Sequence, residues 1–247
     1  LSSLIKAVTP TGAGTAKTWT FAPTSTGGDT RKTYTVEHGS ADRAQEINYG
    51  LVTGMTLNFT RDECTLSGTM LGKALVDNQA LTSLTSSDEI ALIPVMPTQV
   101  AIYLADTAAG LAGATALSRA FSGSFTLENL TGPIYPLNQS SSFAAMVETE
   151  PTGTAQFMAA VDTEGMAPLT NLRAGTTKFM RIKAVGALIT GSDYYTLTVD
   201  AALKITRPQE FRDEQGVYAV GWEGELTHDS TWGKACEIAV INTLTAL

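Results

Sequence analysis

Few side chains in this sequence have the types and spacing that catalysis needs. The chain has two histidines, His38 and His228, and the run His228-Asp229-Ser230 contains the three residue types of a hydrolase triad. A triad is an arrangement in space, and successive residues cannot adopt its geometry on their own. We therefore interpret this run as the polar end of a strand that leads into a turn. The sequence predicts no enzymatic activity and no catalytic residue.

Metal and cofactor chemistry finds no better support. The two histidines and two cysteines are too far apart to have the ligand spacing of a metal site, so we expect no metal and no cofactor. Cys64 and Cys236 lie near opposite ends of the chain. We favour free, buried thiols over a disulfide, because nothing else in the sequence indicates an oxidising compartment. A disulfide between them stays open as the alternative.

Glu223 and Glu225 could form a pair of carboxylates. Two carboxylates can serve as a general acid and base. They also alternate along a stretch with the period of a strand, Val217 to His228, in which Tyr218, Val220 and Trp222 have the opposite parity. We interpret the glutamates as an exposed acidic strand face. The elements that would carry such a face therefore become the main question.

Composition favours an extensive β-structure in a globular chain. The 247 residues are 43% hydrophobic and only 16% charged, which excludes disorder, and threonine, which suits exposed strand faces, is frequent. We predict a single domain, 1–247, of mainly β fold. The net charge of −8 argues against a protein that coats nucleic acid. No apolar run approaches the ~18 residues of a membrane-spanning helix, and we see no basic-then-apolar leader, so we expect no membrane insertion.

The stretch 51–75 has the pattern of a long β-hairpin. Leu51, Met55, Leu57 and Phe59 fall on one face of its first arm, and a short charged link at 61–63 predicts the turn. The other face is made mainly of small polar residues. We single out Thr56, Asn58, Thr60, Thr65, Ser67 and Thr69 on that face.

The rest of the chain predicts a second long hairpin at 195–228, a short helix at 168–174 that ends at Gly175, and an extended loop at 76–98. Residues 1–16 predict an N-terminal arm that needs a partner surface to become ordered. Leu4, Ile5 and Val8 are apolar residues without a neighbouring core in the sequence. We therefore expect these three on an adjacent subunit.

Three stretches together resemble the tail tube (major tail) proteins of long-tailed bacteriophages of the siphophage type. They are Gly14 to Pro23 followed by Lys32 to Gly39, then Val52 to Leu71, and finally Tyr195 to Asp200 through Trp232 to Asn242. The resemblance is one of order and spacing across most of the chain, and no single motif in it is diagnostic.

The resemblance implies a β-sandwich or barrel tail-tube fold with two long hairpins and one short helix. In such proteins hexameric rings stack into a hollow tube, the hairpins of each subunit join a continuous inner β-barrel, and arms or loops reach into the next ring. DNA passes down the lumen into the host without specific binding. Other tail proteins (tail tip, tape measure and terminator) would be the partners, and the protein would lie in the virion tail after assembly in the host cytoplasm.

The polar face and the acidic balance then predict which residues line the channel. Walls that hold DNA poorly need hydration and repulsion in place of Lys and Arg contacts. We predict that the six polar residues of the first hairpin, with Glu223 and Glu225, face the lumen. The alternative function is a tail-tip, fibre or carbohydrate-binding β-sandwich module, which predicts exposed aromatic residues that converge on a groove.

Overall fold

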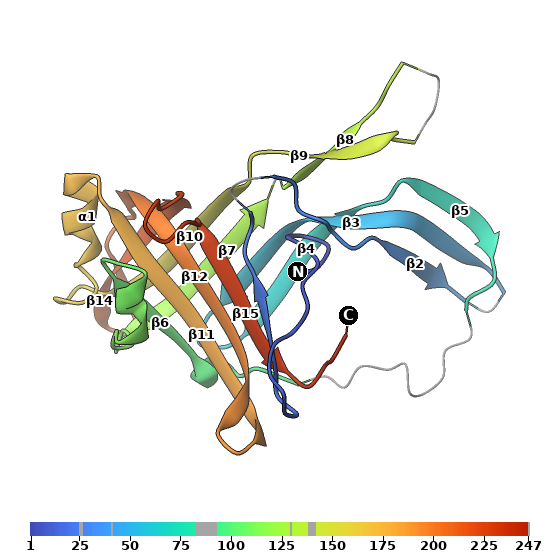
Figure 1. Cartoon of the computed structure of the whole chain (residues 1–247). Coiled ribbons are helices and arrows are strands. Elements are labelled where there is room, and N and C mark those ends of the chain that lie inside the picture. The colour runs from blue at the N-terminus through green and yellow to red at the C-terminus, as the bar shows by residue number, and fades with distance from the viewer. Residues whose placement is uncertain (25–26, 41, 83–92, 129, 138–141, 247) are drawn as a thin grey trace.

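The computed structural model describes residues 1–247 apart from 25–26, 41, 83–92, 129, 138–141 and 247. The described part of the chain is mainly β (Figure 1), with one α-helix, α1 (Pro168–Ala174), and the 3-10 turns η2 (Pro97–Gln99) and η3 (Ala109–Ala112). The strands are β1 (Lys17–Phe21), β2 (Tyr34–Gly39), β3 (Ala44–Phe59), β4 (Cys64–Leu71), β5 (Ala74–Gln79), β6 (Val100–Ala105), β7 (Ala120–Glu128), β8 (Thr131–Ile134), β9 (Ala145–Glu148), β10 (Thr152–Ala160), β11 (Thr177–Thr190), β12 (Asp193–Pro208), β13 (Arg212–Glu214), β14 (Val217–Leu226) and β15 (Cys236–Asn242).

Strand β12 divides the sheet into two layers. It pairs with β11 along one edge, and along its other edge it pairs first with β15 and then, from Leu203 to Pro208, with β14. The first layer continues from β14 through β10, β7 and β3 to β4, and the second contains β1, β15, β11 and β6. All of these pairings are antiparallel.

The two layers enclose one main hydrophobic core. Phe125 and Trp222 from the first layer and Met180 from the second are fully buried in it. Trp222 also satisfies its indole N–H, which donates to the Gly165 carbonyl at 2.7 Å. Helix α1 lies beside this core, and Leu169 and Leu172 pack against it. Gly175 ends the helix in the left-handed region (φ 63°), which glycine adopts without steric cost.

Strand β3 belongs to two regions of the molecule. From Leu51 to Phe59 it pairs with β4 and β7 inside the first layer. From Ala44 to Gly50 it pairs with β2 and β5 and forms a three-stranded extension, which we call the ribbon. Tyr49, with φ 54°, lies at an irregularity in the register between the two parts.

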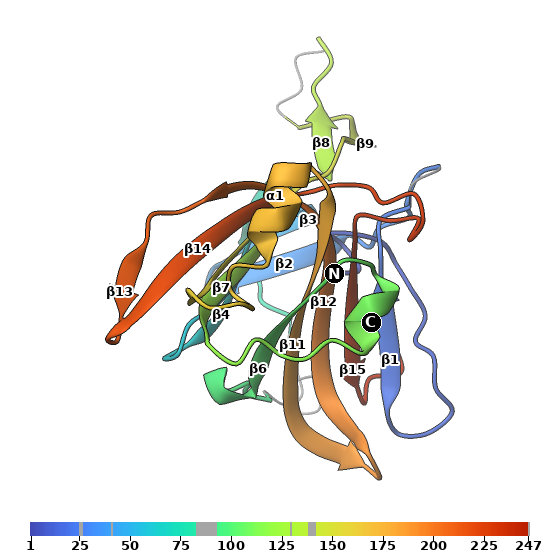
Figure 2. The same ribbon diagram turned by 90° about the vertical axis from the view of Figure 1, so that its left-hand side faces the viewer.

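The ribbon and the β8–β9 pair, which we call the small hairpin, both extend away from the two layers (Figure 1). The two layers with their core and α1 form the remainder, which we call the body. Figure 2 shows the body from the side, with α1 at one end and the long β11–β12 pair running toward the other. The fold thus consists of a packed body and two projections.

The first hairpin is longer than its sequence pattern predicts. It begins at Ala44 instead of 51, and its return arm continues through β5 to Gln79. The predicted turn at 61–63 is present, closed by the Thr60 N–H, which donates to the Glu63 carbonyl at 2.9 Å. The predicted extended loop 76–98 therefore begins too early. Its residues 83–92 lie outside the described part of the chain.

The second hairpin pairs differently from the prediction. β12 and β14 do meet, but the longer partner of β12 is β11, and the two are joined by a tight turn with Gly191 at φ 57°. From the sequence alone, a strand is expected here only over 179–185, just before Gly186, whereas β11 continues to Thr190. The glycine hid the continuation, because it interrupts the apolar alternation.

The N-terminal segment is not a free arm. Leu4 and Ile5 are 1% and 0% exposed in the main core of their own chain, and Val8 packs against that core. The expectation that these residues lack a core of their own and lie on an adjacent subunit is therefore wrong. The partners that bury them are distant in the sequence, so local pattern could not reveal them.

Candidate functional surface

Cross-strand register brings small polar side chains into continuous rows on one face of the first layer, which we call the polar face. Its residues alternate with the buried residues of each strand. One row reads Thr65, Asn58, Ser124, Gln156, Glu223 and Arg207. The next reads Ser67, Thr56, Thr126, Thr154, Glu225 and Lys204. A shorter third row reads Thr69, Gly54, Glu128 and Thr152.

The opposite face of the same strands explains why the rows are so regular. Phe125 pairs in register with Leu57 on one side and Ala155 on the other, and all three are buried. Side chains alternate between the two faces of a strand, so a slip of one residue would move the whole apolar set into solvent. Burial of the core face therefore determines which residues of each strand lie on the polar face.

Hydroxyl groups dominate the centre of the polar face. Thr56 Oγ1 and Thr126 Oγ1 lie 3.2 Å apart across β3 and β7, within hydrogen-bond distance. The rows contain no aromatic side chain. The result is a surface of small polar side chains, hollowed beside Asn58, Ser124 and Gln156 by a cavity of about 320 Å³.

The charges on the polar face are arranged so that the cations are occupied. Arg207 donates from Nε and Nη2 to Glu223 Oε2 at 2.9 and 2.8 Å. The Lys204 ammonium donates to the Gly175 carbonyl. Glu225 and Glu128 are exposed, and no ion pair within the described ranges reaches them. The face consequently presents carboxylates, and its basic groups are engaged at its edge.

Two strand edges bound this face. β4 pairs only with β3, so its outer edge carries no strand of the described chain, and Leu66 on it is 70% exposed. On the far side the rows end on β12, and β13, which pairs with residues 217–219 of β14, has no other partner among the described strands. Every neighbouring pair from β4 to β14, and from β14 to β13, is antiparallel, so β4 and β13 run in opposite directions.

The residues singled out from the sequence occupy the following positions. Asn58, Thr65, Ser67 and Thr69 are exposed on the polar face, as is Glu225, whereas Thr56 and Glu223 are half-buried there. Thr60 lies at the turn, where its Oγ1 accepts from the Asp62 and Glu63 N–H groups at 3.3 Å.

Strands β7 and β10 join the two predicted sets, and sequence reasoning missed their contribution. The signal was present, because Ser122, Ser124, Thr126 and Glu128 alternate with Gly123, Phe125 and Leu127. The additional residues of the face are Ser122, Ser124, Thr126, Glu128, Thr152, Thr154 and Gln156.

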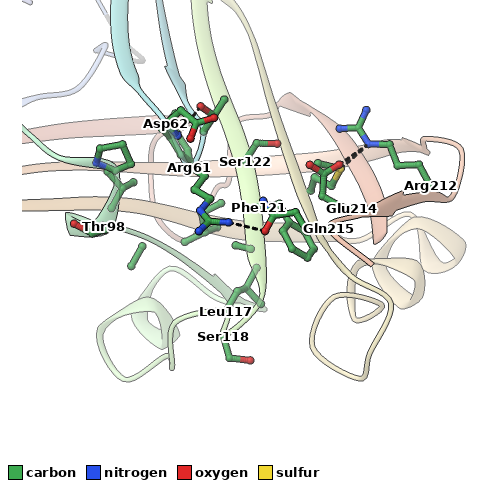
Figure 3. Close-up of a pocket in the computed structure, with 18 residues that line it drawn as sticks. Arg61, Asp62, Thr98, Leu117, Ser118, Phe121, Ser122, Arg212, Glu214 and Gln215 are labelled. Carbon is green, nitrogen blue, oxygen red and sulfur yellow. Dashed lines mark hydrogen bonds and ion pairs between the residues drawn. The ribbon is translucent and has the colours of Figure 1, made fainter. Parts of the chain in front are cut away.

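A cleft of about 590 Å³ lies at the end of the first layer, between the β3–β4 turn, the start of β6 and the β13–β14 turn. Arg61 crosses its mouth and donates from Nη1 to Gln215 Oε1 at 2.8 Å, as Figure 3 shows. The described residues that line it include the hydroxyls of Ser118 and Ser122 and the carboxylates of Asp62 and Glu214, but no histidine.

The other candidate residues contribute to the structure of the fold. Asp229 stabilises the turn between β14 and β15, where its Oδ1 accepts from the Trp232 N–H at 2.7 Å. Cys64 and Cys236 are both free. Burial raises the pKa of both thiols, that of Cys236 to about 12. Among the described residues, no cluster of His, Cys, Asp and Glu could hold a metal ion.

Comparisons with known proteins add no identification. Models of known protein families give no match to the chain, and no curated protein matches it. In the described part of the chain, no helix has the length and apolar character required to cross a membrane.

Proposed function

We propose that this chain is the structural subunit of a phage tail tube. Six copies join side by side into a ring, with the polar faces turned inward, and rings stack into the hollow tube that conducts DNA into the host. The observation that carries the proposal is the polar face itself, which runs without interruption from β4 to β12, while β4 and β13 each have one edge without a strand partner among the described residues.

The two edges of the face are suited to each other. Because β4 and β13 run in opposite directions, β13 of one copy can pair with β4 of the next in the antiparallel sense used throughout the layer. Side-chain alternation would then keep every polar row on the same side of the joined sheet. Closure of the ring would also remove the exposed edges, which otherwise favour aggregation.

The chemistry of the polar face suits the passage of a polyanion. DNA is held by Lys and Arg, which displace its counterions. Here Arg207 is paired with Glu223, and Glu128 and Glu225 leave the face with an excess of carboxylates. A hydrated hydroxyl surface with this charge repels phosphates and gives DNA no site at which to stop.

The projections supply surfaces for the remaining contacts. Exposed apolar residues on the ribbon, such as Leu75, and on the small hairpin, such as Tyr135 and Leu137, would contact the neighbouring ring. The tail-tip, tape-measure and terminator proteins would be the other partners. The protein would act in the virion, after assembly in the host cytoplasm and without insertion into a membrane.

Negative-stain electron microscopy over a range of concentrations tests the proposal, with a matched pair of variants. Leu66→Lys places a charge on the β4 edge and should abolish rings and tubes. Leu188→Lys changes another exposed leucine, on β11 and away from both edges, and should leave assembly intact. Hollow rings from wild type and Leu188→Lys, with dispersed protein from Leu66→Lys, are expected. Monomers of wild type at every concentration, or rings from Leu66→Lys, contradict it.

A carbohydrate-binding or tail-tip role is the second candidate, and one observation favours it. Phe211 and Tyr218 form an exposed stacked pair, with ring centroids 5.6 Å apart and an interplanar angle of 9°. Trp19 and Trp222 are buried and unavailable for such a role. A glycan array with Phe211→Ala as the control distinguishes this function, because only a binding platform would lose glycan signal in the variant.

A further inference from the structure

The N-terminal segment 1–8 lies where both projections leave the body. Beyond the buried Leu4 and Ile5, backbone hydrogen bonds attach it to residues 30–32. The Lys32 N–H donates to the Ser2 carbonyl at 3.0 Å, and the Ala7 N–H donates to the Thr30 carbonyl at 2.7 Å. The segment and residues 30–32 therefore form one hydrogen-bonded unit on the core.

Ser3 connects this unit to the root of the ribbon. Its Oγ accepts from the Val52 N–H at 3.0 Å. Val52 lies just past the place where β3 leaves the ribbon, and the irregular backbone at Tyr49 lies on the ribbon side. The hydrogen bond thus holds β3 where its pairing changes from the strands of the ribbon to β4.

Arg31 connects the same unit to both legs of the small hairpin. Its Nε donates to the Ile5 carbonyl at 2.9 Å, and its Nη1 donates to the Leu130 carbonyl at 2.9 Å. Its Nη2 lies 3.2 Å from Glu148 Oε1 in an ion pair. Leu130 precedes β8 and Glu148 ends β9. A planar guanidinium holds its acceptors in fixed directions, so these contacts restrict the orientation of the hairpin.

An aromatic contact links the two projections to each other. Phe143, between β8 and β9, is buried, and its ring centroid lies 6.0 Å from that of Tyr49 in an edge-to-face arrangement. The ribbon, the small hairpin and the N-terminal unit are therefore connected in a triangle. Two sides of that triangle depend on Ser3 and Arg31.

We propose that Ser3 and Arg31 are positioning residues that fix the directions of the ribbon and the small hairpin relative to the body. The partner that requires those directions is a second copy of this chain in the neighbouring ring. That partner rests on the proposed function, whereas the bracing contacts do not. Loss of either contact loosens a projection without removing any side chain that another copy touches.

Hydrogen exchange followed by mass spectrometry on the full chain tests the ribbon contact. Ser3→Ala should speed amide exchange in residues 44–50 and β5 about tenfold and leave β7 and β10 unchanged. Ser2→Ala is the matched control, because Ser2 Oγ is buried with no hydrogen-bond partner among the described residues. It should leave exchange in the ribbon as it is in wild type.

The same measurement tests the hairpin contact with arginine variants. Arg31→Gln should speed exchange in β8 and β9 about tenfold, and Arg43→Gln, which removes an exposed ion pair of the ribbon with Asp77, should not. Arg31→Lys keeps the charge near Glu148 and should give an intermediate rate. Two results would overturn the proposal. In Ser3→Ala and Arg31→Gln, amide exchange could rise evenly over the body and the projections, or it could rise nowhere.

Electron microscopy of the same variants separates the two proposals. If wild type forms rings, we expect Ser3→Ala and Arg31→Gln to form fewer, and Ser2→Ala to match wild type. If both Ser3→Ala and Arg31→Gln form rings in normal yield although their projections are loosened, then assembly does not require the fixed directions of the projections. If wild type forms no rings, while Ser3→Ala and Arg31→Gln speed local exchange, the proposed function is contradicted and the bracing contacts are supported.

Discussion

The body and the ribbon are built on the same strand, yet they treat apolar side chains in opposite ways. In the body half of β3, Leu57 and Phe59 are buried against the second layer. In the ribbon, Leu75 is 60% exposed, and Tyr34 and Val76 are also exposed. The ribbon half of β3 lacks the regular apolar alternation of the body half, and no second layer of the described chain covers the apolar side chains that the ribbon presents. A strand pattern indicates a two-faced surface, and tertiary contacts decide whether its apolar face has a partner.

This comparison assigns different tasks to the two regions. The body covers most of its apolar face with its own chain, and Leu66, Leu188 and Tyr218 are among the apolar side chains that it leaves exposed. The ribbon and the small hairpin keep exposed apolar side chains on thin, few-stranded units, which gain little stability alone. On the proposed function, the body is the wall, joined to its neighbours in the ring through β4 and β13, and the projections are the parts that contact a copy in the next ring.

The largest expected difference between the regions concerns core truncation. Phe125→Ala in the body removes a fully buried ring and should lower the free energy of unfolding by about 3–5 kcal/mol. Leu75→Ala in the ribbon should cost less than about 1 kcal/mol, because most of that side chain is already exposed. Urea denaturation measures both. Equal losses would mean that the ribbon is part of the core.

The body and the ribbon each contain an arginine–aspartate contact, and the two differ in burial. In the body Arg181 donates from Nε and Nη2 to the buried Asp200, each at 2.7 Å. Arg181→Ala leaves that carboxylate buried without its partner and should cost about 3 kcal/mol. In the ribbon Arg43 pairs with Asp77 in solvent, and Arg43→Ala should leave the free energy of unfolding nearly unchanged.

Thermal unfolding of wild type and of the two arginine variants measures the loss of stability in each variant. The Arg181 variant should unfold several degrees below the wild type, since about 1 kcal/mol corresponds to ~2–4 °C in a chain of this size. The Arg43 variant should coincide with wild type. A destabilised Arg43 variant would show that the ribbon carries more of the folding free energy than its exposure indicates.

The smallest expected effect concerns the polar face and DNA. Asn58→Arg adds a cation at an exposed position of the face, and the assembled protein should then retain short duplex DNA about tenfold more strongly at low salt, with an affinity that falls as salt rises. Thr35→Arg adds the same charge on the exposed ribbon. Fluorescence anisotropy should detect little binding by that control. Equal binding by the two variants would contradict a special role for the polar face.

The sequence could predict those parts of the fold that depend on local alternation. The second half of β3, β4, the charged turn after Phe59 and helix α1 follow from periodicity and from Gly175. The first half of β3 could not be seen, because polar residues and the irregularity at Tyr49 interrupt the period. The burial of Leu4 and Ile5 depends on residues far along the chain, and no local signal reports such a contact.

The candidate surface was predictable in part for a similar reason. Local alternation identifies which residues share a face of one strand, so Asn58 and Glu223 could each be assigned to a polar side. Which strands are neighbours is a property of topology. β7 and β10 lie between the two predicted strands and join Asn58 to Glu223 through Ser124 and Gln156. That order could not be read from any single stretch.

The most direct test of the account is a cryo-electron microscopy reconstruction of the assembled protein. We predict a ring in which Thr126 and Thr154 line the lumen and β4 of each copy lies beside β13 of its neighbour. A reconstruction that places these threonines on the outer wall or between subunits would contradict the central claim, as would rings joined through surfaces other than these two edges.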